Sequence, residues 1–361
     1  MPITEAQVLE LLKSVIDPTT GKDYVSSKEI KKVRVSGDAV IVDVVLGYPA
    51  KSQLEPVRRQ IQSALAAVSG AVTVNVSFKI VSHAVQGGVK LVPGVRNIIA
   101  VASGKGGVGK STVAVNLALA LAAEGATVGV LDADIYGPSQ PMMLGIQGKR
   151  PTSPDGKTLD PMVAHGLQAM SIGFLIDMEQ PMVWRGPMVT QALEQLLRDT
   201  HWKDLDYLIV DMPPGTGDIQ LTLAQKVPVT GAVIVTTPQD IALLDARKGL
   251  KMFEKVNVPI LGVVENMSTH VCSNCGHEEH VFGAGGGEKL AHDNGVTVLG
   301  SLPLDIHIRE QADSGNPTVV SAPDSPAAHT YREIARKVAV RIAEKAQNFS
   351  AAFPKIVIQN T

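Results

Sequence analysis

The sequence predicts an α/β fold in which a mainly parallel sheet is flanked by helices and preceded by a small αββαβ domain. From residue 97 onward, short apolar runs alternate with helical segments; the runs are IIAVAS, TVGVLDAD, YLIVDMPPG, GAVIVTTP and ILGVVENM. Continuous apolar strands that alternate with helices indicate a parallel sheet covered on both faces. A glycine-rich motif at residues 104–111, between the first such strand and the next helix, is the second observation that favours this class.

The small domain is expected to occupy residues 1–82. Its apolar residues follow a helical period in some segments and a period of two in others, and the short turn Ser36-Gly37-Asp38 is typical of a hairpin. The elements, in order, are a helix over 3–15, a hairpin over 31–47, a helix over 51–67 and a strand over 71–76. Such a unit can close its own hydrophobic core.

Three further segments are expected after the small domain. Residues 83–96 contain glycines and a proline without periodicity, which predicts a linker. The main domain would then extend over residues 97–346, and a polar tail over 347–361. A helix that begins near Pro326 has a narrow apolar face, which favours packing on the sheet over binding to a membrane surface.

Composition limits the function classes. The chain has 361 residues and a formal net charge of −2, so it lacks the basic surface expected of a protein that binds nucleic acid or an anionic membrane. No run reaches the ~18 apolar residues of a membrane span, and the first residues do not resemble a secretion signal. We therefore expect a cytoplasmic protein with no nucleic-acid partner and no membrane partner. The two cysteines, Cys272 and Cys275, are too few for a disulfide framework.

Residues 104–111, GKGGVGKS, fit the pattern G-x-x-x-x-G-K-[ST] and precede a predicted helix over 112–123. Glycines let the backbone turn its N–H groups toward phosphate oxygens, and the helix N-terminus adds a favourable dipole. Lys110 should reach the β- and γ-phosphates of ATP, and Ser111 should reach Mg²⁺. The expected nucleotide-binding residues are Gly104, Lys105, Gly106, Gly107, Val108, Gly109, Lys110, Ser111 and Thr112. The motif therefore predicts a P-loop NTPase.

Acidic residues follow the next apolar strands, where a P-loop fold needs them. Asp211 ends one strand and is expected to hold Mg²⁺ through water. Asp134 is the candidate for positioning the attacking water. Asp132 has a competing interpretation, since a strand-end aspartate often caps the next helix. Residues 213–218, PPGTGD, are typical of a loop that senses the γ-phosphate.

The extra lysine at position 105 and the segments LDADIYGPS and DMPPGTGD together resemble the deviant-Walker P-loop ATPases. That class includes nitrogenase iron protein, the septum-site and plasmid-partition ATPases, and the Mrp-type iron–sulfur carriers. The resemblance implies that Lys105 crosses a dimer interface and stabilises phosphoryl charge at the partner's nucleotide. It also implies adenine contacts by Asn266, Pro303 and Asp305. The expected catalytic residues are Lys105, Lys110, Asp134 and Asp211.

The motif Cys272-Ser273-Asn274-Cys275 places two sulfurs on one tight turn, as in metal-chelating C-x-x-C loops. Two thiolates are half of a coordination shell, and three interpretations complete it. One chain could add two of the histidines His270, His277 and His280 to form a zinc site. The pair could act as a redox dithiol, although no thioredoxin-like context surrounds it. A symmetric dimer could instead pool two pairs around one [4Fe–4S] cluster on its two-fold axis.

Residues 266–283 and the segment WRGP at 184–187 resemble the Mrp family of ATP-binding iron–sulfur cluster carriers. This resemblance implies a homodimer with slow ATP hydrolysis that assembles a [4Fe–4S] cluster between its subunits. Its partners would be iron–sulfur scaffold or donor proteins and recipient apoproteins. The N-terminal unit is similar to a small domain of iron–sulfur assembly factors but has no cysteine, so we expect no cluster ligation there. Two other functions stay open: a positioning ATPase acting on membrane or DNA, and a zinc-stabilised nucleotide-binding module.

Overall fold

The computed structural model describes residues 3–68, 70–82, 90–176, 186–272 and 274–352, with side chains as far as residue 345. Two compact units are present. Of the described residues, the first unit comprises those up to 81 together with 123–125 and 339–352, and the second comprises those of 82–122 and 126–338. Parts of the expected linker (83–89), of the WRGP segment (184–185) and of the expected tail (353–361) lie outside the described residues.

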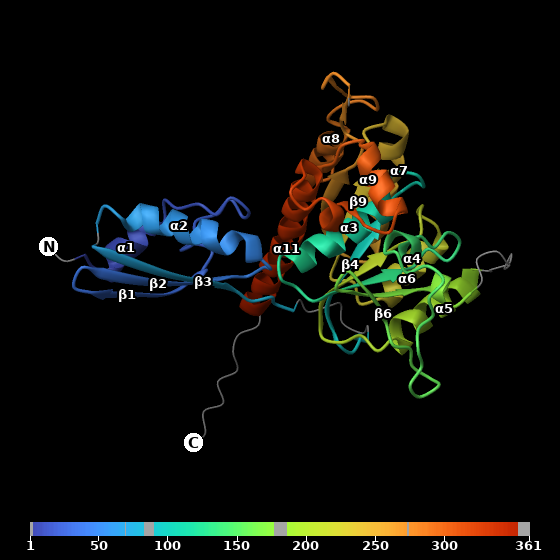
Figure 1. The fold of residues 1–361 in the computed structure, drawn as a ribbon, viewed down its shortest axis with the longest axis horizontal. Helices are drawn as coiled ribbons and strands as arrows, with labels where there is room; N and C mark the ends of the chain where they lie inside the picture. The colour runs from blue at the N-terminus through green and yellow to red at the C-terminus, as the bar shows by residue number, and fades with distance from the viewer. Residues whose placement is uncertain (1–2, 69, 83–89, 177–185, 273, 353–361) are drawn as a thin grey trace. The chain divides into compact units, whose positions relative to one another are not determined.

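The first unit contains the predicted αββαβ order. Its elements are α1 (Glu5–Leu12), β1 (Ile30–Ser36), β2 (Ala39–Leu46), the short helix η1 (Lys51–Gln53), α2 (Leu54–Leu65) and β3 (Ala71–Phe78). Strand β2 lies in the middle of the sheet, antiparallel to β1 and parallel to β3. Every second residue of β2 is buried, and Figure 1 shows α1 and α2 together on one face of this sheet. The alternating pattern therefore marks the face that packs against the helices.

The second unit is built on an eight-stranded sheet with the order β13-β10-β9-β4-β8-β5-β7-β6. All neighbouring strands are parallel except β6 and β7. The strands are β4 (Val95–Ala102), β5 (Val128–Asp132), β6 (Met162–Ala164), β7 (Leu167–Ser171), β8 (Leu205–Asp211), β9 (Gly231–Thr236), β10 (Ile260–Glu265) and β13 (Val298–Ser301). The prediction of a mainly parallel sheet is confirmed.

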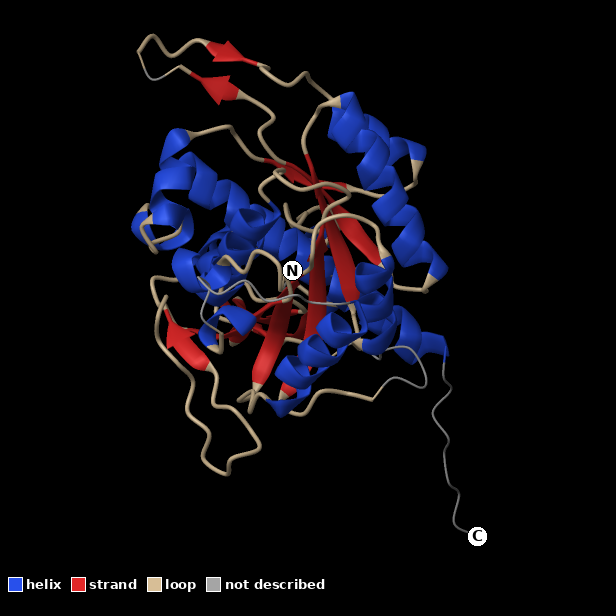
Figure 2. Ribbon diagram, turned by 90° about the vertical axis from the view of Figure 1, so that its right-hand side faces the viewer, coloured by secondary structure: helices blue, strands red, loops and turns tan. Residues whose placement is uncertain are grey.

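Helices cover both sides of this sheet (Figure 2). The helices of this unit are α3 (Lys110–Ala123), α4 (Gln140–Met143), η2 (Ile172–Phe174), α5 (Gly186–Asp199), α6 (Asp218–Lys226), α7 (Asp240–Lys255), α8 (Gly286–Asp293), α9 (Ile306–Asp313), α10 (Thr318–Ser321) and the part of α11 (Pro326–Ala352) before residue 339. Helix α3 is buried nearly all round, which suits its almost wholly apolar sequence after the first turn. Among the helices of the described residues, none combines the length and apolar character that a membrane span requires.

A separate two-stranded hairpin carries the cysteines. Strand β11 (His270–Val271) pairs antiparallel with β12 (Glu278–Glu279), and the cysteine loop connects them. Figure 2 shows these two short strands projecting from the body of the second unit. The hairpin begins shortly after β10, so the same sheet edge positions both the cysteine loop and the end of a core strand.

Candidate functional site

The glycine-rich loop runs from the end of β4 to the first turn of α3, as its motif predicts. Gly107 and Gly109 have φ angles of 81° and 80°, in the left-handed region that side chains with a Cβ adopt only with strain. A Cβ on Gly104 would overlap the backbone carbonyl of Asp245 on α7. Glycine is thus required at these positions by backbone conformation and by close packing, before any ligand is considered.

The loop ends at a buried lysine that is paired with a buried carboxylate. Lys110 is 6% exposed and Asp211 is fully buried, and the Lys110 ammonium contacts Asp211 Oδ1. The same ammonium lies 3.2 Å from Ser111 Oγ. The structure therefore brings together the three side chains that the sequence assigns to phosphate and Mg²⁺.

The aspartate that ends β5 and the one two positions beyond it have different surroundings. Fully buried Asp132 accepts hydrogen bonds from the backbone N–H groups of Ser139 and Gln140, at 3.0 and 3.1 Å, so it caps the start of α4. Burial, together with the nearby Asp211 carboxylate, raises the pKa of Asp132 to about 7. Burial also raises the pKa of Asp134, which is only partly buried and accepts from Gly137 N at 3.3 Å.

A cavity of about 240 Å³ lies over the loop. Its lining residues are Ser103, Lys105, Gly106, Gly107, Gly109, Lys110, Ser111, Thr112, Asp134, Gly137, Ser139, Met143 and Pro214. Ser139 Oγ is buried and has no hydrogen-bond partner within the described part of the chain. The left-handed glycines, the buried ammonium and this unsatisfied hydroxyl fit the phosphates and metal of a Mg²⁺-bound nucleoside triphosphate.

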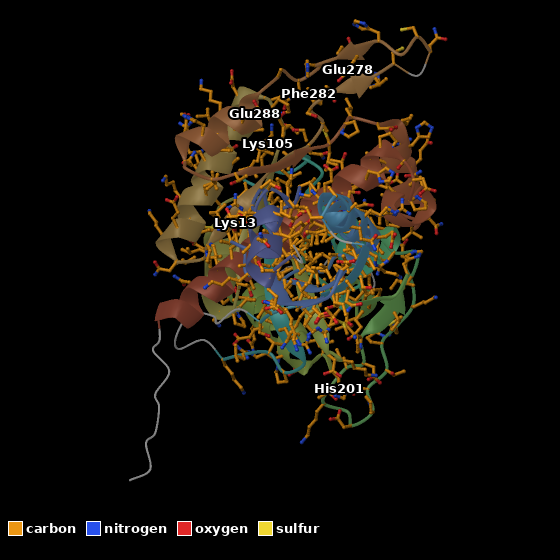
Figure 3. All side chains as sticks on the ribbon, turned by 90° about the vertical axis from the view of Figure 1, so that its left-hand side faces the viewer. Lys13, Lys105, His201, Glu278, Phe282 and Glu288 are labelled. Carbon is orange, nitrogen blue, oxygen red and sulfur yellow. The ribbon has the colours of Figure 1, made fainter. Side chains whose placement is uncertain are left out.

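Lys105 differs from Lys110 in its surroundings. Its side chain is exposed at the rim of the same cavity and makes no ion pair with the residues that the structure describes. Figure 3 places Lys105 toward the same end of the second unit as Glu278 of β12 and the following Phe282. A lysine in this position can reach a second molecule without leaving an internal partner behind.

The residues expected to contact adenine are divided between two places. Asn266 donates from Nδ2 to the Val108 carbonyl at 2.9 Å, so its amide is held against the phosphate loop. Asp305 instead caps α9, where it accepts from His307 N at 2.8 Å. Pro303 and Asp305 line a second cavity of about 710 Å³, of which Cys272 is also a wall. They do not line the phosphate cavity.

The cysteine loop is closed by its own backbone. Cys272 N donates to the His277 carbonyl at 2.9 Å, and Gly276 N donates to the Cys272 carbonyl at 2.8 Å. Cys272 is partly buried and Cys275 is exposed. Hydrogen bonds from the backbone of Asn274 and Cys275, followed by one from the Cys275 side chain, lower the pKa of the Cys272 thiol. The loop therefore favours the thiolate, which is the form that ligates metal.

Two of the three histidines near the loop each direct one ring nitrogen to the backbone. His270 Nδ1 lies 3.1 Å from the Leu304 carbonyl, and His280 Nδ1 lies 2.9 Å from the Ser268 carbonyl. Among the described residues, no three side chains of His, Cys, Asp or Glu come together as a metal site. Within one chain, the described part of this hairpin offers two thiols and no further preformed ligand.

Sequence reasoning missed Gln140, which is 1% exposed and hydrogen-bonds to Asp211. The available signal was weak: a glutamine directly after Gly137-Pro138-Ser139, eight positions beyond the strand-end Asp132. Glutamine has no motif of its own there, because its contribution depends on which atoms the fold places around it.

The comparisons with known proteins agree with this geometry. A family model described as an NUBPL iron-transfer P-loop NTPase matches residues 94–339, and one described as an iron–sulfur cluster assembly protein matches residues 5–78. This chain belongs to the NUBPL iron-transfer P-loop NTPase family. Membership confirms the family resemblance and the P-loop NTPase class that the sequence predicts, while the roles of individual site residues stay predictions.

Two curated relatives match most of the chain. An iron–sulfur cluster carrier protein of Escherichia coli strain K12 is 54% identical over 342 residues, which are 93% of this chain and 92% of that protein. The iron–sulfur cluster transfer protein NUBPL of Mus musculus is 54% identical over 255 residues, or 70% of this chain and 80% of that protein.

A solved nucleotide-binding protein from Archaeoglobus fulgidus, in complex with ADP, is 38% identical with a TM-score of 0.55. It covers 62% of this chain and 87% of its own. The cell division ATPase MinD of Pyrococcus furiosus, with a TM-score of 0.52 and 23% identity, shares the fold and covers 67% of this chain and 98% of its own.

Proposed function

We propose that this protein is an ATP-dependent iron–sulfur cluster carrier, a homodimer that binds one [4Fe–4S] cluster between the Cys272 and Cys275 pairs of its two subunits. The cluster is cargo, received from scaffold or donor proteins and delivered to apoproteins. The observation that carries this proposal is a loop with one partly buried and one exposed thiol, without another preformed ligand among the residues that the structure describes, on a P-loop NTPase of an iron-transfer family.

Ligand number supports a shared cluster. A [4Fe–4S] cluster takes four thiolates, and one chain supplies two. A two-fold axis through the interface would bring two identical loops face to face, so two half-sites would make one complete site. Exposure of Cys275 suits delivery, because an acceptor protein's thiols can approach a ligand that is not enclosed.

The nucleotide site is assigned from its contacts. Ser111 and Asp211 would hold Mg²⁺, which neutralises phosphate charge when it is bound. Lys110 would move from Asp211 to the β- and γ-phosphates, and Asp134 would orient the water that attacks the γ-phosphorus. Bond formation to that water oxygen and cleavage of the bond to the β–γ bridging oxygen yield ADP and phosphate. Lys105 would add positive charge to the partner subunit's nucleotide.

Hydrogen bonds link the nucleotide loop to the cysteine hairpin. Asn266 is bonded to the phosphate loop, and Cys272 follows it after six positions. Between them, Ser268 N donates to the Leu302 carbonyl at 2.9 Å, and Leu304 N donates to the Thr269 carbonyl at 2.7 Å. A change in the phosphate loop would therefore act on the base of the hairpin through a short bonded segment, which supports nucleotide-gated release.

The test is anaerobic cluster reconstitution of the wild type and of the Cys272→Ala, Cys275→Ala double variant. We expect about four irons and four sulfides per dimer in the wild type, and neither in the variant. ADP affinity should be equal in both proteins, because the cysteines do not line the phosphate cavity. A double variant that retains a full cluster, or a wild-type monomer that holds one alone, would contradict the proposal.

A further inference from the structure

Gln140 is a buried polar side chain at the centre of the phosphate site. It is 1% exposed and begins the short helix α4. Its backbone N–H is held by Asp132 Oδ2 at 3.1 Å, so the carboxylate at the end of β5 fixes where the side chain starts. Burial of an amide lowers the stability of the folded state unless the polar atoms of the amide form hydrogen bonds.

One amide nitrogen of Gln140 reaches both predicted Mg²⁺ residues. Nε2 donates to Asp211 Oδ2 at 2.9 Å and to the backbone carbonyl of Ser111 at 3.2 Å. These residues belong to the end of β8 and the start of α3, which are different parts of the chain. The amide therefore sets the separation between the carboxylate of Asp211 and the residue whose hydroxyl is expected at the metal.

The two oxygens of Asp211 have separate donors. Lys110 contacts Oδ1, and Gln140 bonds to Oδ2. When Lys110 moves to the phosphates of a bound nucleotide, Gln140 is the donor that still orients the carboxylate. An amide can do this without neutralising the charge, whereas a cationic side chain would compete with the metal.

The acceptor of the same side chain is unused. Gln140 Oε1 is buried and has no hydrogen-bond partner in the described ranges of the chain, and Ser139 Oγ beside it is in the same condition. Buried polar atoms without partners are uncommon, and each calls for a ligand or water that completes it. Water bound to a metal at Ser111 and Asp211 is a hydrogen-bond donor of the required kind.

We propose that Gln140 is a positioning residue for Mg²⁺: its Nε2 orients Asp211 against Ser111, and its Oε1 accepts a hydrogen bond from water of the metal's shell. The inference rests on the assignment of Ser111 and Asp211 to Mg²⁺ in the proposed function. It separates metal binding from phosphate binding, because Asp211, to which the Gln140 amide is bonded, is assigned to Mg²⁺ and not to the phosphates.

The experiment measures ADP affinity by calorimetry, with saturating Mg²⁺ and with EDTA, in the wild type, in Gln140→Met and in Gln168→Met. Methionine keeps the length of glutamine and removes both hydrogen-bonding groups. Gln168 is the matched control. It lies on strand β7, away from the phosphate cavity, and its amide donates to the Lys203 carbonyl at 2.8 Å. Binding of Mn²⁺ to the ADP complex, followed by electron paramagnetic resonance, provides a direct readout of the metal.

Mg²⁺ should raise ADP affinity in the wild type. For Gln140→Met we expect the ratio of ADP affinity in Mg²⁺ to that in EDTA to fall about 10-fold, and the affinity of the ADP complex for Mn²⁺ to fall by the same factor. ADP affinity in EDTA should stay within about 2-fold of the wild type, as should both values for Gln168→Met. An unchanged Mg²⁺ gain, or an equal loss in EDTA, would overturn the inference. A wild type with no Mg²⁺ gain would instead refute the metal assignment itself.

A second variant covers the case in which Gln140→Met does not fold. Gln140→Glu keeps the size of the side chain and places a second carboxylate beside Asp211. This carboxylate should bind the Lys110 ammonium and hinder the movement of Lys110 to the phosphates. We expect weaker ADP binding in EDTA for this variant, combined with Mn²⁺ binding that is not reduced, because a carboxylate is itself a metal ligand. Loss of Mn²⁺ binding in Gln140→Glu would contradict the geometry.

Discussion

The phosphate site and the cysteine hairpin lie in the same unit but are built in opposite ways. The charged side chains of the phosphate site, those of Lys110, Asp132 and Asp211, are almost completely buried. Lys110 contacts Asp211, and Asp132 accepts a hydrogen bond from the backbone of Gln140. The hairpin has two strands of two residues each, an exposed Cys275 and an exposed Val271. The first site is completed by the fold, and the second stays incomplete until something outside the chain reaches it.

This difference separates stability from function. A substitution in the phosphate site removes a partner from a buried group and so lowers stability as well as activity. A substitution in the hairpin removes an exposed atom and should leave the free energy of unfolding nearly unchanged. The predictions below test that separation, in order of decreasing effect.

The largest effect is expected for Lys110→Met. Loss of the ammonium should lower the rate of ATP hydrolysis about 10³-fold, because positive charge at the transferring phosphoryl group is removed. Asp211 would also stay buried without a cation, which should cost about 1–3 kcal/mol of unfolding free energy. Steady-state phosphate release and urea unfolding measure the two effects. Lys226→Met, which breaks the exposed ion pair with Glu194, is the control and should alter neither.

Lys105→Ala should lower hydrolysis about 10²-fold if its charge acts on the partner's nucleotide in the proposed dimer, and it should not change stability, because Lys105 is exposed. The sharper test is mixing. A heterodimer of Lys105→Ala and Lys110→Met subunits has one site with an intact Lys110 and a lysine supplied by its partner. An equal mixture should recover roughly a quarter of the wild-type rate through random pairing. A mixture as inactive as its components would show that Lys105 does not act in trans.

Much of the architecture could be predicted because its signals are local. The phosphate loop needs glycine for backbone reasons that hold in any sequence, and buried parallel strands are continuous apolar runs, as β8 and β9 are. The αββαβ unit could be predicted from the alternation of β2. Local pattern is sufficient where one segment determines its own structure.

The rest depended on contacts that sequence does not encode locally. Strands β11 and β12 have two residues each, too few for any period to appear. From sequence, Asp132 could be one of the acidic residues of the phosphate site or a helix cap, and in the structure it accepts hydrogen bonds from the backbone N–H groups of Ser139 and Gln140. Gln140 has a role only through atoms that come from β8 and α3.

The first unit also contains a buried carboxylate, that of Glu29, at a place where no nucleotide is expected to bind. Glu29 is 6% exposed and accepts from Ser27 Oγ at 2.9 Å. Burial, followed by repulsion from Asp17, raises the pKa of Glu29 to about 7, from an ordinary value of 4.5. A carboxyl with a raised pKa favours the folded state when protonated, so its contribution is complete below about pH 4.5 and is lost as pH rises through about 7.

We therefore expect the first unit to lose about 2–3 kcal/mol of local stability between about pH 5 and about pH 8, and Glu29→Gln to remove most of that loss. Hydrogen–deuterium exchange of peptides from residues 24–46, corrected for intrinsic rates, measures it in the full chain. Glu5→Gln, at an exposed position of α1, is the control and should keep the wild-type pH dependence. Equal pH dependence in wild type and Glu29→Gln would mean that Glu29 is ionised throughout.

The smallest effect is expected for His277→Ala. His277 is exposed next to the cysteine loop and contributes its backbone carbonyl to Cys272 N, a bond that alanine preserves. If the dimer supplies four thiolates, iron and sulfide per dimer should be unchanged, and the free energy of unfolding should shift by less than about 0.5 kcal/mol. If the loop is instead half of a zinc site in which His277 is one of the two histidine ligands, His277→Ala should lower stoichiometric zinc sharply. Metal analysis of anaerobically purified protein distinguishes the two outcomes, since cluster ligation needs only the sulfurs and zinc ligation needs the ring.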